Sequence, residues 1–260
     1  MIKALFFDID GTLVSFQTHK VPQSTCDALR RARANGVKVF IASGRPPQLL
    51  DNISDVAPLM DGYVLATGAL CLYEGKVVRK DVIPEEEVRE VVRICQKENV
   101  ALVVVGTQDL QIVNRNEVYD RVFRDLLKVS YNKFDVPLEE VIAQGVLQMT
   151  PFLTDDEEQR LLPPLPGCAS ARWHPTFCDL TSVAADKANG IRAIARHLGI
   201  GIAETMAFGD GGNDITMLQS VGTGVAMGNA LDEVKQAAHY ITTDVDHDGV
   251  KNALEHFGII

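Results

Sequence analysis

The sequence has few cysteines and no long hydrophobic run, and both shortages narrow the class of protein. Its five cysteines are scattered without C-x-x-C spacing, and an odd number fits a reducing compartment better than a disulfide framework. The N-terminal apolar stretch is broken at Asp8, too early for a signal peptide, and no later run approaches the length of a membrane-spanning helix. We therefore expect a cytoplasmic protein that does not enter a membrane.

Basic residues are also in short supply. The chain has 25 Lys and Arg against 35 Asp and Glu, a net charge of -10, which argues against binding to nucleic acid or to anionic membranes. An anionic substrate would therefore need a local cation. The 260 residues, 46% of them apolar, suffice for one large domain or two modest ones with a buried core.

Apolar segments that predict strands alternate with helical segments at both ends of the chain. We expect strands at 3–7, 38–42, 63–66, 205–208, 224–227 and 240–241, and helices at 24–35, 187–198, 213–220, 230–238 and up to 256. Pro46 and Pro47 suit the first turn of a further helix. This alternation predicts an α/β fold with a doubly wound, mostly parallel sheet, whose ligands bind beyond the carboxyl ends of the strands.

The alternation is interrupted in the middle of the chain. An amphipathic helix is expected from Pro84 to about Glu98, followed by strands at 100–105, 110–113, 146–150, 169–173 and 178–181. The βα rhythm resumes near residue 185. We therefore predict an inserted α/β unit at 83–184, between the two halves of a core formed by 1–82 and 185–260.

Polar residues follow three of the predicted core strands. Asp8 and Asp10 end the first strand, Ser43 follows the second, and residues 209–214, with the sequence GDGGND, follow the strand that begins at Thr205. Alternate residues of an extended chain share a face, so the two aspartates can converge, and their like charges then need a cation or a shared proton. An oxygen-rich site of this kind suits Mg²⁺ and a phosphate group.

Each of these signals has a structural alternative. Asp8, Asp10 and the GDGGND segment also suit tight turns, and Ser43 suits the cap of a helix. Lys187 is expected in the first turn of a helix, where the helix dipole disfavours a cation. A lysine there indicates a nearby anion, with a solvated side chain as the alternative.

Four segments taken together resemble a known family. DIDGT at 8–12, ASGR at 42–45, DKANG at 186–190 and GDGGND at 209–214 resemble the four motifs of the haloacid dehalogenase superfamily of phosphatases. Their order and spacing, with GVAMGNA at 224–230 and DGV at 248–250, resemble the Cof-type sugar-phosphatase branch. The resemblance spans the whole chain and implies a Rossmann-like core with a large α/β cap at 83–184 that determines substrate specificity.

The resemblance also implies catalytic roles. Asp8 would attack phosphorus to form an aspartyl-phosphate, and Asp10 would act first as acid and then as base. Ser43, Lys187 and Asn213 would hold the phosphoryl oxygens. The remaining substrate-binding positions implied by the motifs are Thr12, Gly44 and Arg45.

The cofactor implied by the resemblance is Mg²⁺. Its ligands would be Asp8, the backbone carbonyl of Asp10, and Asp210, with Asp214 supporting through water or Lys187. Two positions depart from the family pattern: Thr67 stands where the branch usually has Asn, and Gly190 lies three residues after Lys187 instead of immediately after it.

We therefore expect a Mg²⁺-dependent phosphomonoesterase whose partner is a small phosphate ester, most simply a sugar (hexose) phosphate. Pentose, polyol and pyridoxal phosphates and flavin mononucleotide remain alternative substrates. A phosphotransferase or phosphomutase is the alternative enzyme, and a phospho-accepting switch is the alternative outside catalysis. The sequence carries no signal for an oligomeric state.

Three further patterns are weaker. Asp244 to Glu255 fits a calcium-loop pattern, but a β-branched segment precedes it where a helix is required, so acids near the start of the last helix are the simpler interpretation. The glycines between Gly222 and Gly228 lack dinucleotide-loop spacing. Four residues of the inserted unit face either the crevice or the surface of a hairpin: Arg172, Trp173, His174 and Asp179.

Overall fold

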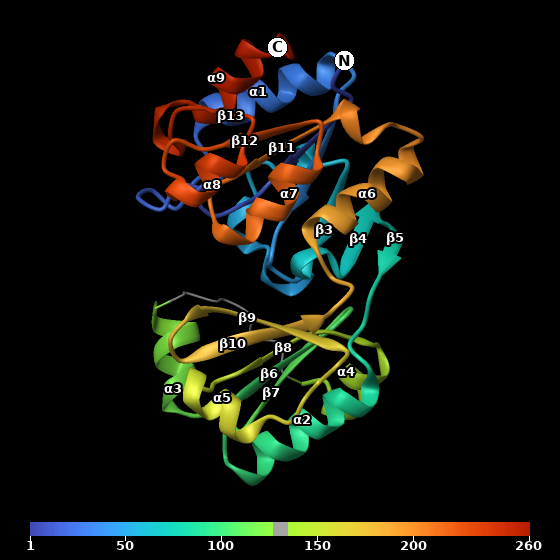
Figure 1. The fold of residues 1–260 in the computed structure, drawn as a ribbon, viewed down its shortest axis with the longest axis vertical. Helices are drawn as coiled ribbons and strands as arrows, with labels where there is room; N and C mark the ends of the chain where they lie inside the picture. Colours follow the sequence, from blue (N-terminus) through green and yellow to red (C-terminus); the bar gives the residue numbers. More distant parts are fainter. Residues whose placement is uncertain (127–134) are drawn as a thin grey trace. The chain divides into compact units, whose positions relative to one another are not determined.

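Two β-sheets organise the chain in the computed structural model, which describes residues 1–126 and 135–260 (Figure 1). The chain divides into two compact units. The first unit comprises 1–44, 51–80 and 186–260, and the second comprises 45–50 and 81–185. The predicted insertion at 83–184 includes 127–134, which lie outside the described residues, and the role of the second unit as a cap stays a prediction.

The first unit contains an eight-stranded sheet in the order β13-β12-β11-β1-β2-β3-β4-β5. The strands from β13 to β3 are parallel, and β4 and β5 are antiparallel. The prediction of a mostly parallel α/β sheet is therefore confirmed. The strands are β1 (Ala4–Phe7), β2 (Lys38–Ala42), β3 (Gly62–Leu65), β4 (Leu70–Tyr73), β5 (Lys76–Lys80), β11 (Thr205–Gly209), β12 (Thr223–Ala226) and β13 (Tyr240–Ile241).

Helices cover both faces of this sheet, which is why its central strand is apolar on both sides. All four residues of β1 are fully buried. Phe6 stacks on Phe40 at 4.9 Å between ring centroids, and Phe7 stacks on Phe208 at 4.6 Å. In Figure 1, α1 and α9 lie together over one face, and α6, α7 and α8 lie over the other. The helices are α1 (Gln23–Ala34), α6 (Lys187–Leu198), α7 (Ile215–Ser220), α8 (Asp232–Ala237) and α9 (Gly249–His256).

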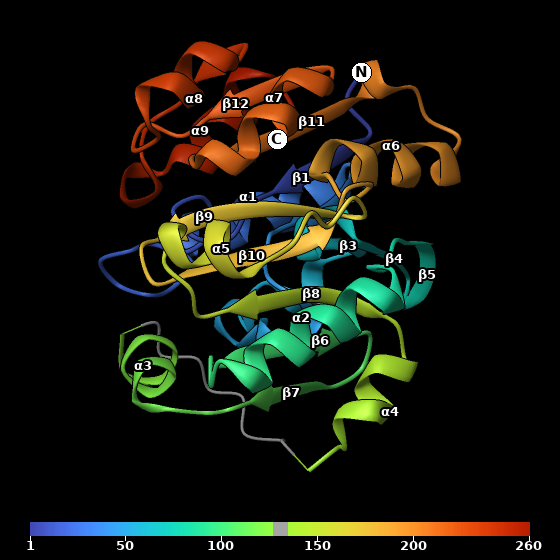
Figure 2. The same cartoon turned by 60° about the horizontal axis from the view of Figure 1, so that its bottom comes forward.

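The second unit contains a five-stranded antiparallel sheet in the order β7-β6-β8-β10-β9. Helices α2 and α4 pack on one face (Figure 2), and an aromatic cluster that includes Tyr119, Phe123 and Phe177 packs on the other. The elements are α2 (Glu85–Lys97), β6 (Leu102–Gly106), β7 (Leu110–Val113), α3 (Glu117–Tyr119), a π-helical turn (Asp120–Leu126), α4 (Leu138–Ala143), β8 (Val146–Pro151), α5 (Asp155–Leu161), β9 (Cys168–His174) and β10 (Phe177–Ser182). None of the helices described in either unit is long and apolar enough to cross a bilayer.

The prediction of a helix after Pro46 is wrong. The structure has only single 3₁₀ turns there, at Pro47–Leu49, Asp51–Ile53 and Ala57–Leu59. Pro58 removes a backbone donor, and the Asp and Asn residues between the prolines have low helix propensity, so a continuous helix is disfavoured. The sequence prediction placed 45–50 in the core formed by 1–82 and 185–260, whereas these residues belong to the second unit.

The hairpin residues of the second unit make internal contacts. The Arg172 guanidinium donates to the carbonyls of Leu153 at 2.8 Å and Phe177 at 2.9 Å, and forms an ion pair with Glu158 at 2.6 Å. The His174 ring stacks on Phe177. The Trp173 side chain lies outside the described residues. Arg172 therefore stabilises the turn between β9 and β10.

The loop that fits the calcium pattern follows a strand. It begins after β13, and the Asp244 carboxylate accepts a hydrogen bond from the Asp246 backbone N–H at 3.0 Å and contacts the His247 ring at 2.7 Å. Asp248, with φ of 61°, then leads into α9. The Asp244 carboxylate thus caps the turn before the last helix.

Gly190, inside α6, and Gly199, which caps the C-terminus of α6, provide a matched pair of stability tests. A Cβ at Gly190 would overlap Val64 Cγ1 and lie 3.1 Å from Cys71 Sγ, whereas a Cβ at Gly199, where φ is +67°, would meet no atom within 4 Å. We expect Gly190→Ala to lower the free energy of unfolding by about 1–3 kcal/mol through overpacking, although Ala favours helices. Gly199→Ala should cost about 1 kcal/mol through backbone strain alone. Urea denaturation measures both; a Gly190→Ala protein as stable as wild type would contradict this packing.

Candidate active site

The site forms where three neighbouring parallel strands end. Phe7 of β1 pairs in register with Ile41 of β2 and Phe208 of β11, so the residues after them leave the sheet at the same level. The Asp8 backbone N–H still donates to the Phe208 carbonyl at 3.0 Å. Parallel register therefore brings the ends of the three strands together, at the edge where ligands bind in sheets of this type.

A buried lysine joins two of the carboxylates. Lys187 is fully buried, and its Nζ lies 2.6 Å from Asp8 Oδ1 and 2.6 Å from Asp214 Oδ1. The anion that the position of Lys187 indicated is thus a pair of carboxylates. Breaking a buried ion pair on one side leaves an uncompensated charge, so the three side chains depend on one another.

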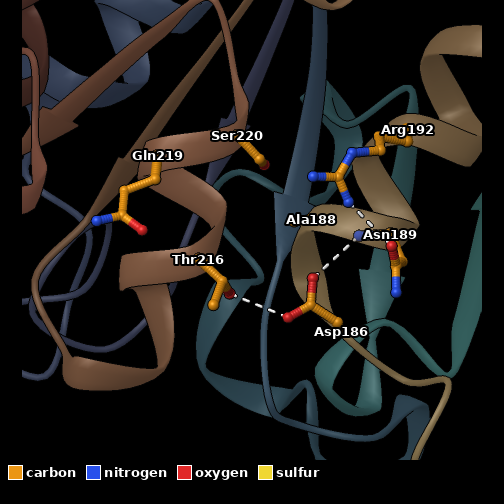
Figure 3. Close-up of a pocket in the computed structure, with 7 residues that line it drawn as sticks. All are labelled: Asp186, Ala188, Asn189, Arg192, Thr216, Gln219 and Ser220. Carbon is orange, nitrogen blue, oxygen red and sulfur yellow. Dashed lines mark hydrogen bonds between the residues drawn. The ribbon is translucent and has the colours of Figure 1, made fainter.

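Helix α6 is held in place at the residue before Lys187. Asp186 caps the helix: its Oδ1 accepts the Asn189 backbone N–H at 3.1 Å, and its Oδ2 accepts the Thr216 hydroxyl of α7 at 3.0 Å. Figure 3 shows both bonds in a pocket of about 520 Å³ between α6 and α7. Its lining contains none of the strand-end carboxylates, so we assign this pocket to the support of Lys187 and not to chemistry.

The Asp214 carboxylate is engaged on both oxygens. While Oδ1 binds Lys187, Oδ2 accepts the backbone N–H groups of Asp210 and Gly211, each at 3.0 Å. A side chain at Gly209 would come within 2.5 Å of Asp214 Cβ, so glycine is required for this tight loop. Asp214 therefore fixes the loop and the lysine together.

The Asp210 carboxylate lies against the first motif. Its Oδ1 accepts the Thr12 hydroxyl at 2.8 Å, and Asn229 Nδ2 lies 3.5 Å from its Oδ2 and donates to the Gly11 carbonyl at 2.8 Å. Gly11 has φ of +85°, and a Cβ there would overlap Asp210 Oδ2. The Thr12 hydroxyl, predicted to bind substrate, is engaged by Asp210 in this structure. Asn229 was missed, although it lies in the GVAMGNA segment.

Other predicted residues follow β2 and β11. Ser43 is buried at 2% exposure, and its carbonyl accepts the Thr67 N–H at 3.1 Å. A Cβ at Gly44 would lie 3.7 Å from both Asn213 Nδ2 and Thr67 Oγ1, so these side chains gather around Gly44. Arg45 belongs to the second unit and donates to the Leu49 carbonyl at 3.2 Å.

Asp10 has a neighbour that the sequence did not indicate. Asn52 Nδ2 donates to Asp10 Oδ1 at 3.1 Å. Asn52 lies in the 3₁₀ turn Asp51–Ile53, outside every motif, so no local pattern points to it. The structure thus adds two asparagines, Asn52 and Asn229, to the predicted set.

The electrostatics of the cluster favour a bound cation. Oxygen atoms of Asp8, Asp210 and Asp214 lie within 4.8 Å of one another, and the positive charge in ion-pair contact with Asp8 and Asp214 is that of Lys187. Burial raises the pKa of Asp8 to about 8; the charge of Lys187 opposes this shift, and the charge of Asp214 adds to it. Burial also raises the pKa of Asp210, to about 6. Burial alone would lower the pKa of Lys187, but Asp214 and Asp8 outweigh it, so the ammonium stays charged. This excess of oxygen ligands and negative charge fits a divalent cation such as Mg²⁺.

The sequence and the structure were compared with those of known proteins, and the matches include phosphatases and related hydrolases. A sequence profile of the haloacid dehalogenase-like hydrolases matches residues 5–254. The chain is 32% identical to the putative phosphatase YkrA of Bacillus subtilis (strain 168), over 99% of this chain and 98% of YkrA. A solved haloacid dehalogenase subclass IIB sugar phosphatase, BT4131, is 46% identical, with a TM-score of 0.87 over 99% of this chain and 100% of that one. Another solved structure, described in a crystallographic study of a trigonal-bipyramidal intermediate in a phosphoryl-transfer superfamily, is 46% identical, with a TM-score of 0.89 over 100% of both chains.

The chain therefore belongs to the haloacid dehalogenase-like hydrolases, and it is an enzyme of the phosphatase class. The resemblance to this superfamily and to its Cof-type branch is confirmed.

The raised pKa values predict how the stability of the metal-free protein depends on pH. An acid whose pKa is raised in the folded state binds more protons when folded, so stability is lost as pH rises through the shifted range. For Asp8, shifted from 3.8 to about 8, we expect a loss of order 1 kcal/mol per pH unit between pH 6 and 8. Urea denaturation in chelator measures it. Asp8→Asn should flatten this slope, and an unchanged slope in that variant would contradict the assignment.

Proposed function

We propose that this enzyme is a Mg²⁺-dependent phosphomonoesterase that hydrolyses a small phosphorylated metabolite, a sugar phosphate, through an aspartyl-phosphate. The observation that carries the proposal is the buried Lys187, which bridges Asp8 and Asp214 at 2.6 Å beside Asp210. A cation in contact with a strand-end carboxylate is what phosphoryl transfer needs to neutralise the oxygens of the transferred group.

Three residues are proposed to bind the metal directly, and a fourth supports them. We assign Mg²⁺ to Asp8, the backbone carbonyl of Asp10, and Asp210. Asp214 already binds Lys187 and two backbone N–H groups, which supports the predicted role of Asp214 as a supporting residue. When bound, the metal neutralises charge on the phosphoryl oxygens and on the carboxylates.

Two carboxylates take part in the chemical steps, Asp8 as the nucleophile and Asp10 as the acid and base. An Asp8 oxygen attacks phosphorus, the ester P–O bond breaks, and the leaving oxygen takes a proton from Asp10. Water then attacks the aspartyl-phosphate and gives its proton to Asp10, while the Asp8 O–P bond breaks and phosphate is released. Two displacements on one aspartate replace a single difficult one.

The neighbouring residues hold the transferred group. Lys187 and the Ser43 hydroxyl are assigned to the phosphoryl oxygens, with Asn213, whose amide lies near Gly44. The Thr12 hydroxyl contacts Asp210 in the structure, so we assign this hydroxyl to the orientation of the Asp210 carboxylate. The backbone of Thr12 and the backbone of Gly44 are assigned to binding the phosphate. Arg45 is assigned to the substrate beyond the phosphate.

The second unit is proposed to determine the substrate, as a cap that excludes water. The description of BT4131 as a sugar phosphatase, at 46% identity over nearly the full chain, supports a sugar phosphate. A panel of hexose, pentose and polyol phosphates with pyridoxal phosphate and flavin mononucleotide, ranked by kcat/KM, tests the substrate class. Transfer to a second sugar hydroxyl instead of water would indicate the phosphomutase alternative.

Asp8→Asn tests the nucleophile. We expect the variant to lose phosphate release from every ester by at least about 10³-fold, because the amide cannot form the aspartyl-phosphate. Activity of the wild type should also require Mg²⁺ and vanish in chelator. Phosphate release that survives Asp8→Asn would rule out this mechanism.

Metal binding can be measured without turnover. We expect saturating Mg²⁺ to raise the melting temperature of the metal-free protein by about 5–10 °C, as binding to the folded state alone requires. Asp210→Asn should remove most of this rise. Asp246→Asn, in the exposed loop before α9, is the matched control and should keep it; loss of the rise in the control instead would place the metal in that loop.

A further inference from the structure

The turn between β3 and β4 has a backbone conformation that its side chains do not favour. Ala66, Thr67 and Gly68 all have positive φ, of 48°, 56° and 93°. Glycine adopts this left-handed conformation freely and asparagine tolerates it, but a β-branched residue in it is a genuine outlier. Thr67 therefore occupies a position where a threonine opposes folding.

Contacts on both sides of the turn hold this conformation in place. On one side, the Thr67 N–H donates to the Ser43 carbonyl at 3.1 Å. On the other side, a Cβ at Gly68 would overlap the backbone carbonyl of Asp186, the residue that caps α6. The turn is thus fixed between the end of β2 and the start of the helix that carries Lys187.

The Thr67 side chain lies beside residues assigned to the phosphate. Its Oγ1 and the Nδ2 of Asn213 would each lie 3.7 Å from a Cβ on Gly44, so the hydroxyl and the amide approach the same point of the backbone. Thr67 is half-buried, and no hydrogen bond of its hydroxyl is seen within residues 1–126 and 135–260. A strained residue whose hydroxyl has no such partner calls for a functional reason.

We propose that Thr67 is a substrate-binding residue whose hydroxyl donates a hydrogen bond to an oxygen of the phosphoryl group. The inference rests on the proposed function. Two uncharged donors, the Thr67 hydroxyl and the Asn213 amide, bind the phosphoryl group beside Gly44, in addition to Lys187. Because a β-branched side chain is stiff at χ1, the hydroxyl loses little freedom when the phosphoryl group binds.

Replacement of the hydroxyl by a methyl group tests this contact. Thr67→Val keeps the shape, the β-branch and the backbone strain, so we expect its melting temperature to match wild type. Its Kd for inorganic phosphate, measured by titration calorimetry in saturating Mg²⁺, should rise about 10-fold, because one hydrogen bond to an anion is lost. Thr67→Ser keeps the hydroxyl and should bind phosphate within about threefold of wild type.

Thr67→Asn tests the backbone strain separately. Asparagine accepts a positive φ more readily than threonine, so we expect the melting temperature to rise by about 2–4 °C. A melting temperature that does not rise would contradict the strain, and the reason for a function at this turn would fall with it.

Thr205→Val is the matched control. It removes a hydroxyl that donates to the Ile202 carbonyl at 2.6 Å, at the end of β11 away from Asp210, so its Kd for phosphate should equal that of wild type. An unchanged Kd for phosphate in Thr67→Val would overturn the role of Thr67, even if KM for the esters rose, since the hydroxyl would then contact the leaving group. A wild type that binds phosphate but releases none from any ester would instead overturn the proposed function, and one that binds no phosphate would overturn both.

Discussion

The burial of one ammonium among three carboxylates is the constraint on which the site depends. Lys187 is fully buried and contacts Asp8 and Asp214, and the negative charge nevertheless exceeds the positive. Neighbouring contacts hold this costly arrangement: Asp186 caps the helix that carries the lysine, and two backbone N–H groups bind the far oxygen of Asp214. The fold thus maintains a charge imbalance that a metal ion and a phosphate group together can relieve.

The sheet explains why this imbalance can be held. Strand β1 is buried on both faces between stacked phenylalanines, so the position of Asp8 is determined by a rigid neighbour on each side. Glycines then let the following loops approach one another, since Gly11 and Gly209 have no room for a side chain against Asp210 and Asp214. Rigid strands and permissive turns together place the carboxylates within hydrogen-bonding reach of the lysine.

Much of this was predictable because the signals are local. The alternation of apolar strands with helices predicted the parallel sheet, the strand-end rule brought Asp8, Ser43 and Asp210 to one edge, and the dipole argument singled out Lys187. Asn52 and Asn229 were not predictable in this way, because each contributes through contacts with residues distant in the sequence, Asn52 with Asp10 and Asn229 with Gly11. The 3₁₀ turns after Pro46 were missed because two prolines at a helix start resemble a genuine N-terminus.

The segment 45–50 bears on how such enzymes can be recombined. It follows Gly44 directly, yet Gln48 donates to the carbonyls of Gly106 and Asp109 at 3.0 and 3.3 Å, and Leu49 packs against the aromatic cluster of the second unit. That unit is therefore built from two pieces of chain, not one. A chimera in which only 81–185 came from a relative would combine the relative's sheet with the native residues 45–50. Both segments therefore have to be exchanged for the unit to pack as it does in one parent.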